Sequence, residues 1–152
     1  MFKLKCHNVY PFQNAIYSDN KQIEFNEFSE SFSAWNSIGK PQMLDPEGSG
    51  QYVPIVSTEI VEAITLDSFC KNNNILKIDV EGAESDVLQG AINLLKNKAI
   101  YFIQFEISQK MLEGLNRSAK STFDILIEYG YECHRINNGD YWRRSNKFQF
   151  FL

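Results

Sequence analysis

The run from Ile75 to Lys96 constrains the fold most, because it is a strand that turns directly into a helix. Residues 75–80, ILKIDV, have the composition of a short strand. From Gly82 onward the apolar residues fall on one helical face. These residues are Val87, Leu88, Ala91, Leu94 and Leu95. A second strand-like run follows at residues 99–107. Strand, helix and strand in this order predict an α/β fold with a mostly parallel sheet.

The remainder of the C-terminal half continues the alternation. Residues 118–129 have helical spacing, and Gly130 is placed to stop that helix. Residues 131–136 and 148–152 are strand-like and are joined by a turn-rich segment without a helix. We therefore expect these last two strands to be antiparallel, at one edge of the sheet. A length of 152 residues suits a single domain over residues 1–152.

The N-terminal half is less regular. Residues 9–18 and 22–28 resemble strands that could form a hairpin, and a third strand is expected at 53–65. Between them, residues 29–52 are rich in Ser, Gly, Pro and Asn, and we expect a long loop with little regular structure. A short helix should follow at 66–72, capped by Thr65 or by Asp67.

Composition excludes several classes of protein. The net charge of −4 argues against nucleic-acid binding, which requires a basic surface. No stretch approaches the roughly 18–20 apolar residues that span a bilayer. The three cysteines, Cys6, Cys70 and Cys133, are far apart and form no CxxC pair, so we expect thiols in a reducing cytoplasm and no zinc site. The histidines His7 and His134, and the Trp142–Arg144 run, are interpreted as structural or solvated.

Acidic residues gather where strands end. Asp79 and Glu81 lie at the predicted strand-to-helix turn, and Glu106 lies at the end of the next strand. If the two strands are adjacent and parallel, Asp79 and Glu106 emerge at the same sheet edge, where open α/β sheets bind ligands. They could then bind a cation, accept a proton or accept hydrogen bonds. Alternatively, Glu81 and Glu84 only stabilise the helix through its dipole, and Asp79 binds loop amides.

The sequence of this region resembles the FkbM family of S-adenosylmethionine-dependent methyltransferases. That family carries a TLD element, a K-I-D-x-E-G-x-E turn and a V-L-x-G-A helix. The matching residues here are Thr65, Leu66, Asp67, Lys77, Asp79, Glu81, Gly82, Glu84, Leu88, Gly90 and Ala91. The segment Asn14–Asp19 resembles the family's N-A-x-S-D element, whereas residues 29–52 are least alike.

The resemblance implies a Rossmann-like class I methyltransferase fold and S-adenosylmethionine as the methyl donor. It implies methyl transfer to a hydroxyl group of a small-molecule or glycan acceptor. In such an enzyme, Asp79 and Glu106 would flank the acceptor as base or cation ligands. Glu81 would bind the cofactor or orient its loop, and Asn14 with Ala15 would lie on the adenine side.

The family's Gly-rich cofactor turn is not found before Asn14, and the chain resembles the family only from its third strand onward. Gly48 and Gly50 have GxG spacing but follow no clear strand. We therefore expect an N-terminally truncated methyltransferase fold. On its own the chain should bind S-adenosylmethionine weakly or not at all and should not turn over. Either its two halves pair directly, or an exposed sheet edge promotes association.

Two other functions remain open at this stage. The first is a non-catalytic remnant that binds a partner. The second is a metal-dependent glycosyltransferase-like protein, since Asp79 and Glu81 form a D-x-E pair that could hold a divalent cation.

Overall fold

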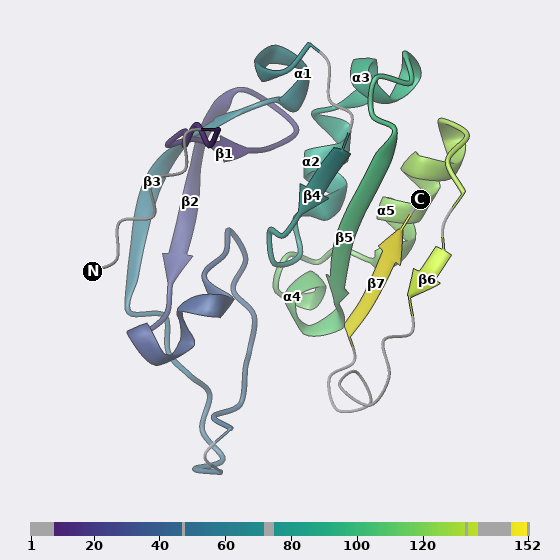
Figure 1. Ribbon diagram of the computed structural model, residues 1–152. Helices are drawn as coiled ribbons and strands as arrows, with labels where there is room; N and C mark the ends of the chain where they lie inside the picture. The colour runs from purple at the N-terminus through teal and green to yellow at the C-terminus, as the bar shows by residue number, and fades with distance from the viewer. Residues whose placement is uncertain (1–7, 47, 72–74, 133, 137–146, 152) are drawn as a thin grey trace.

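The computed structural model describes residues 8–46, 48–71, 75–132, 134–136 and 147–151. The chain folds into two β-sheets with helices between and behind them (Figure 1). The strands are β1 (Ala15–Ile16), β2 (Lys21–Glu27), β3 (Ser57–Ile64), β4 (Ile75–Ile78), β5 (Phe102–Ser108), β6 (His134–Ile136) and β7 (Lys147–Phe151). The α-helices are α1 (Leu66–Phe69), α2 (Glu84–Gln89), α3 (Ile92–Lys96), α4 (Gln109–Gly114) and α5 (Ala119–Glu128).

The first sheet has the order β1-β3-β2. The β3 strand lies in the middle, parallel to β1 and antiparallel to β2. Ala63 of β3 pairs with Ala15 on one side and with Lys21 on the other. The predicted hairpin between the first two strands is therefore wrong. The turn at residues 18–20 instead connects strands that lie on opposite sides of β3. The β1 strand pairs with one edge of β3, and β2 pairs with the other.

The second sheet has the order β4-β5-β7-β6. The β4 and β5 strands are adjacent and parallel, as the sequence predicted, with Ile78 opposite Phe105. The β7 strand is antiparallel to both β5 and β6, which confirms the expected antiparallel C-terminal strands. Two of the five pairings among the described strands are parallel, so the expectation of a mostly parallel sheet is not met.

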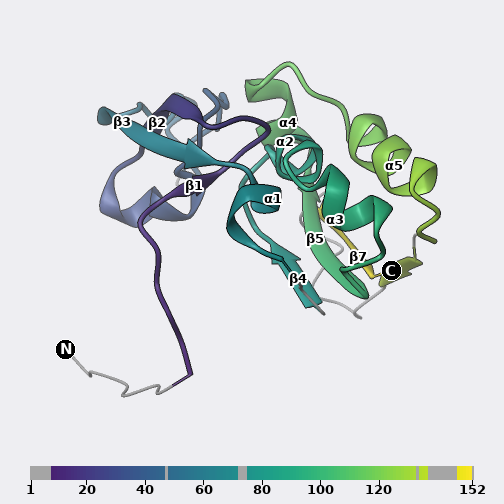
Figure 2. The same cartoon turned by 90° about the horizontal axis from the view of Figure 1, so that it is seen from above.

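Helices α2, α3 and α5 lie along one face of the second sheet (Figure 2). Alternate residues of β5, namely Ile103, Phe105 and Ile107, are buried against these helices. The intervening residues Phe102, Gln104 and Glu106 are only half-buried on the opposite face. This period-two pattern is expected of a strand that is covered on one side. The main core therefore lies between β5 and its helices.

The predicted helix from residue 82 to 96 is divided into α2 and α3 at Gly90 and Ala91. The carboxylate of Asp67 accepts hydrogen bonds from the backbone N–H groups of Asn93 and Leu94, at 2.9 and 3.0 Å. The backbone N–H of Asp67 in turn donates to the carbonyl of Gly90 at 2.8 Å. The helix breaks because α1 supplies the hydrogen-bond partners that a continuous helix would otherwise provide.

Residues 29–52 contain more structure than the sequence predicted. A 3₁₀ helix, η1, spans Glu30–Trp35, and the rings of Phe32 and Trp35 stack with centroids 4.9 Å apart. Isolated β-bridges pair Asn26 with Ser37 and Leu44 with Tyr52. The sequence pattern missed these features because bridges of this kind depend on tertiary contacts and not on periodicity. It also missed α4, whose Met111 and Leu112 are buried.

The described residues form no helix with the length and apolarity that crossing a membrane requires.

Substituting Gly90→Ala should destabilise the protein strongly. A Cβ atom at this position would lie 2.1 Å from the carbonyl oxygen of Tyr17, so the β1 backbone would have to move. We expect a loss of about 3 kcal/mol in the free energy of unfolding, the upper range for overpacking. Urea unfolding provides the measurement. The neighbouring exposed variant Gln89→Ala should change stability by less than about 0.5 kcal/mol. Equal stability of the two variants would contradict the close packing at Gly90.

Candidate functional site

The turn between β4 and α2 has an unusual backbone. Glu81 has φ +50° and Gly82 has φ +102°, so two successive residues are left-handed. Glycine adopts such angles freely, but a glutamate there is strained by about 1 kcal/mol. A Cβ atom at Gly82 would lie 2.7 Å from the carbonyl oxygen of Met111, so the turn packs closely against α4. Strain of this kind is often found at functional sites.

Asp79 lies directly after β4 and forms an ion pair with Lys77, with Nζ and Oδ2 2.8 Å apart. Both side chains are largely exposed. The hydrogen bond to Asp79 and its charge raise the pKa of Lys77, and the charge of Glu106 adds to the effect. Lys77 pairs with Gln104, two residues before Glu106. Both acids therefore act on one ammonium group.

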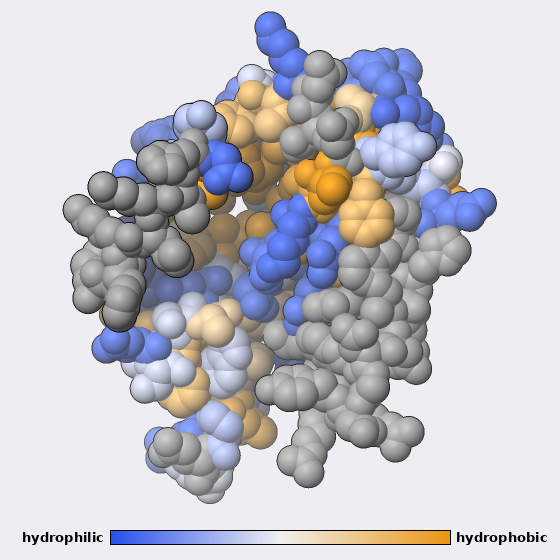
Figure 3. All heavy atoms as spheres, in the orientation of Figure 1, coloured by the Kyte–Doolittle hydropathy of each residue, from blue (hydrophilic) through white to orange (hydrophobic). Residues whose placement is uncertain are grey.

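A cavity of about 340 Å³ brings together residues from both sheets. Asn14 and Ala15 line it from the β1 side, and Asp79 lines it from the β4 side. The other lining residues are Ile16, Tyr17, Ile23, Phe25, Asn36, Ser37, Ile38, Val80 and Ala83. Figure 3 shows a hollow with apolar residues at its floor between the part that carries β2 and the part that carries β4. Three of the five candidate site residues thus share one cavity, whereas Glu81 and Glu106 do not line it.

Glu84, the first residue of α2, is almost fully buried. Its Oε1 atom accepts a hydrogen bond from the backbone N–H of Gly82 at 3.0 Å. Its Oε2 atom has no hydrogen-bond partner within the described residues. The pKa of Glu84 is raised to about 7, chiefly by burial; backbone hydrogen bonds from Gly82 and Glu84 oppose this rise, and the charges of Glu81 and Asp79 add to it. Glu84 therefore stabilises the turn through its hydrogen bond to Gly82.

A buried ion pair fixes the cavity wall, and sequence reasoning did not identify it. Asp86 is buried on α2 and accepts two hydrogen bonds from Arg117, at 2.8 and 3.3 Å. The phenol of Tyr17 lies beside both side chains, and burial, followed by the charge of Asp86, raises its pKa. Tyr17, Asp86 and Arg117 are far apart in the sequence. No periodic pattern in the sequence could have indicated that these residues are in contact.

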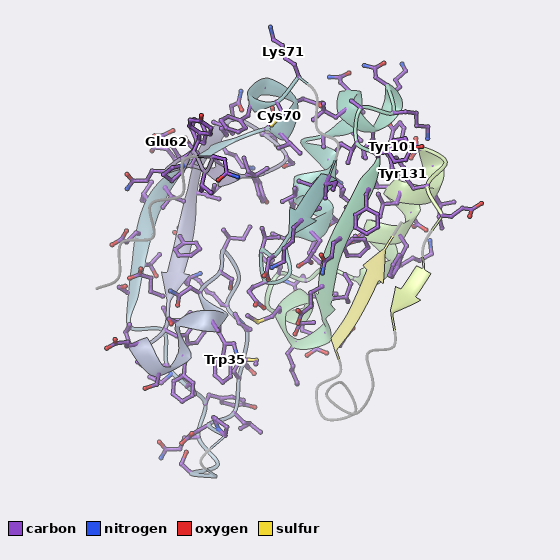
Figure 4. All side chains as sticks on the ribbon, in the orientation of Figure 1. Trp35, Glu62, Cys70, Lys71, Tyr101 and Tyr131 are labelled. Atoms are coloured by element: carbon purple, nitrogen blue, oxygen red, sulfur yellow. The ribbon has the colours of Figure 1, made fainter. Side chains whose placement is uncertain are left out.

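The other residues considered as metal ligands or reactive groups have little support as parts of a site. Among the residues that the structure describes, no group of three or more His, Cys, Asp or Glu side chains is placed to hold a metal ion. Figure 4 shows Cys70 near the end of α1, away from Trp35, and burial raises the pKa of its thiol. Several residues considered from the sequence lie outside the described residues, namely Cys6, His7, Cys133 and Trp142–Arg144. The backbone of His134 belongs to β6.

The stability of the protein should fall as the pH rises, because Glu84 is more easily kept neutral in the folded state. Its contribution is fully present below pH 4.5, the pKa of a free carboxyl, and is lost as the pH rises through about 7. The difference should amount to about 3 kcal/mol. Glu84→Gln keeps a neutral group of the same shape, so it should become more stable than the wild type at pH 8.

Urea unfolding at pH 4.5 and at pH 8 measures this effect. Glu113→Gln, which alters an exposed glutamate, should follow the pH profile of the wild type. Parallel profiles for Glu84→Gln and the wild type would contradict the neutral buried carboxyl.

A double-mutant cycle should reveal strong coupling between Asp86 and Arg117. Arg117→Met leaves a buried carboxylate without its partner, and we expect a loss of about 2 kcal/mol, reduced from the value for fully buried pairs because Arg117 is partly exposed. Asp86→Asn combined with Arg117→Met should lose less than the sum of the single changes. The exposed pair Lys120–Asp124 provides the control, with coupling below about 0.5 kcal/mol. Additive losses at Asp86 and Arg117 would overturn this interpretation.

Comparison with known proteins identifies the family of this chain. The family described as the methyltransferase FkbM domain matches residues 3–133, which is most of the chain. Comparison with curated proteins and with solved structures gives no significant match. The match includes β1, the β4–α2 turn and the end of β5, which carry all five candidate residues. The chain belongs to the FkbM methyltransferase family.

Proposed function

We propose that this chain supplies the adenine and acceptor sides of an S-adenosylmethionine-dependent methyl transfer to a hydroxyl oxygen. One observation carries the proposal: the cavity lined by Asn14 and Ala15 is also lined by Asp79. A cofactor bound along β1 would therefore lie beside the carboxylate at the end of β4. Such an arrangement is consistent with a Rossmann-like domain, in which ligands bind outside the carboxyl ends of the strands.

The cavity suits the adenosyl part of the donor. Its volume of about 340 Å³ lies within the range of ligand pockets, roughly 300–1,000 Å³. Its walls are mainly apolar, from Ile16, Ile23 and Phe25, which favours a flat aromatic base. Asn14 and Asn36 add amide groups that can form hydrogen bonds to ring nitrogens.

Asp79 is the residue best placed to accept the proton of the acceptor. S-adenosylmethionine supplies an electrophilic methyl group on a positively charged sulfur. The acceptor hydroxyl must lose its proton as its oxygen gains that methyl group, and a carboxylate within hydrogen-bond reach can take it. Asp79 and Glu106 bring two negative charges to one ammonium group, that of Lys77. The excess negative charge favours acceptance of a proton by Asp79. It also favours binding of the positively charged methyl donor.

The two other functions have less support. A divalent cation at Asp79 and Glu81 lacks a third acidic or imidazole ligand among the described side chains. A role in partner binding without catalysis explains neither the cavity nor its carboxylate. We expect weak donor binding all the same, since the described residues that line the cavity include no glycine, which a close backbone approach to the methionine end would favour.

Titration with S-adenosylhomocysteine, followed by amide NMR, tests the cavity. In the wild type the amide signals of Asn14, Ala15 and Ala83 should shift, with saturation only at millimolar ligand. Ala15→Phe fills the cavity and should abolish these shifts. Ala34→Phe makes the same change at an exposed position of η1, outside the cavity, and should bind as the wild type does.

Two results would contradict the proposal. The first is the absence of shifts at the cavity in the wild type. The second is equal binding by Ala15→Phe and Ala34→Phe. Calorimetric titration with S-adenosylmethionine separately tests the expected weakness, because a one-to-one complex with a low-micromolar dissociation constant would show a more complete donor site than we propose.

A further inference from the structure

We propose that a second pocket, lined by Lys40 and Lys110, binds an anionic group of the methyl acceptor, a carboxylate or a phosphate. This inference rests on the proposed function and adds the chemical class of the acceptor. The pocket has a volume of about 230 Å³. Its lining residues are Lys40, Gln42, Tyr52, Lys110, Glu113 and Gly114.

The donors in this pocket suit an anion. Two ammonium groups, one side-chain amide and one phenol hydroxyl line it, against the single carboxylate of Glu113. The present partners of the lysines are weak. Lys40 lies 3.7 Å from Glu24, and Lys110 lies 3.5 Å from Glu113, with all four side chains more than half exposed. Exposed pairs contribute little free energy, so both ammonium groups can turn to a ligand.

The pocket lies between two backbone segments that pack closely against each other. The backbone N–H of Lys40 donates to the carbonyl of Gly114 at 3.1 Å. A Cβ atom at Gly114 would lie 2.6 Å from the backbone nitrogen of Pro41, so the loop and the end of α4 are in close contact. On the other side, the amide of Asn26, which is fully buried, donates to the carbonyl of Gly39 at 2.9 Å. The pocket is therefore held in place before a ligand binds, which lowers the entropic cost of binding.

One loop contributes to both pockets. Residues 36–38 line the cavity that contains Asp79, and Lys40 begins the second pocket only two residues later. Two residues of chain span at most about 7 Å. The loop therefore joins the wall of the first cavity to the second pocket, and the proposal is that one acceptor occupies both. This loop belongs to residues 29–52, the part of the sequence least like the family, where specificity for an acceptor is expected to reside.

Amide NMR titrations with inorganic phosphate and with acetate, at constant ionic strength, test the pocket directly. The amide signals of Gln42, Lys110 and Gly114 should shift and saturate. The double variant Lys40→Gln/Lys110→Gln should bind both anions at least about tenfold more weakly. The control, Lys96→Gln/Lys120→Gln, removes two exposed lysines outside the pocket and should bind as the wild type does. Equal affinity in the two double variants, or shifts at every surface lysine, would overturn the proposal.

A second set of titrations tests whether sugars with an anionic group, as models of the acceptor, bind to this pocket. Glucuronate and glucose 6-phosphate should shift signals at this pocket, and the difference between them distinguishes a carboxylate from a phosphate. Neutral glucose should not shift these signals, and equal binding of glucose would overturn the proposal. Neither set of titrations uses the methyl donor. Failure of S-adenosylhomocysteine to bind near Ala15 would therefore refute the proposed function while leaving the anion measurements interpretable.

Discussion

The ion pair between Asp86 and Arg117 supports the candidate site more than any other single interaction. Asp86 is buried on α2 and Arg117 is partly exposed, and Tyr17, which directly follows β1, lies beside both side chains. The first sheet is thereby joined to the helices behind the second sheet. The cavity lies where these two parts meet, with Asn14 and Ala15 on one wall and Asp79 on the other. Backbone hydrogen bonds from Asp67 to Gly90 and from Lys40 to Gly114 also join the two parts.

Several family-motif residues have structural functions that explain their spacing. The side chain of Thr65 accepts a hydrogen bond from the backbone N–H of Ser68 and caps α1. Asp67 caps α3, and Gly90 allows the carbonyl of Tyr17 to approach. These residues assemble the scaffold behind the site. Asp79 is different, because it is exposed and lines the cavity, which is expected of a residue that meets a ligand.

Two carboxyl groups near the β4–α2 turn, those of Glu84 and Asp79, have different surroundings. Glu84 is buried, its pKa is raised to about 7, and it binds the amide of Gly82. Asp79, five residues earlier, is exposed beside the ammonium of Lys77. Differences of this kind commonly divide the tasks of neighbouring acids. Here one carboxyl supports the left-handed backbone of the turn, and the other lies at the cavity, where we propose that it accepts the proton of the acceptor.

The sequence by itself determined the β4–α2 turn, the parallel pairing of β4 with β5 and the family, because these depend on local patterns and on a contiguous motif. It also placed Asp79 and Glu106 on neighbouring strands. Only the tertiary structure decided that β1 and β2 flank β3, and that Asp86 meets Arg117 and Tyr17. Periodicity reports which face of an element is buried, but the partner is chosen by packing and hydrogen bonds between segments distant in sequence. The two pockets depend on such contacts, so no local pattern could have revealed them.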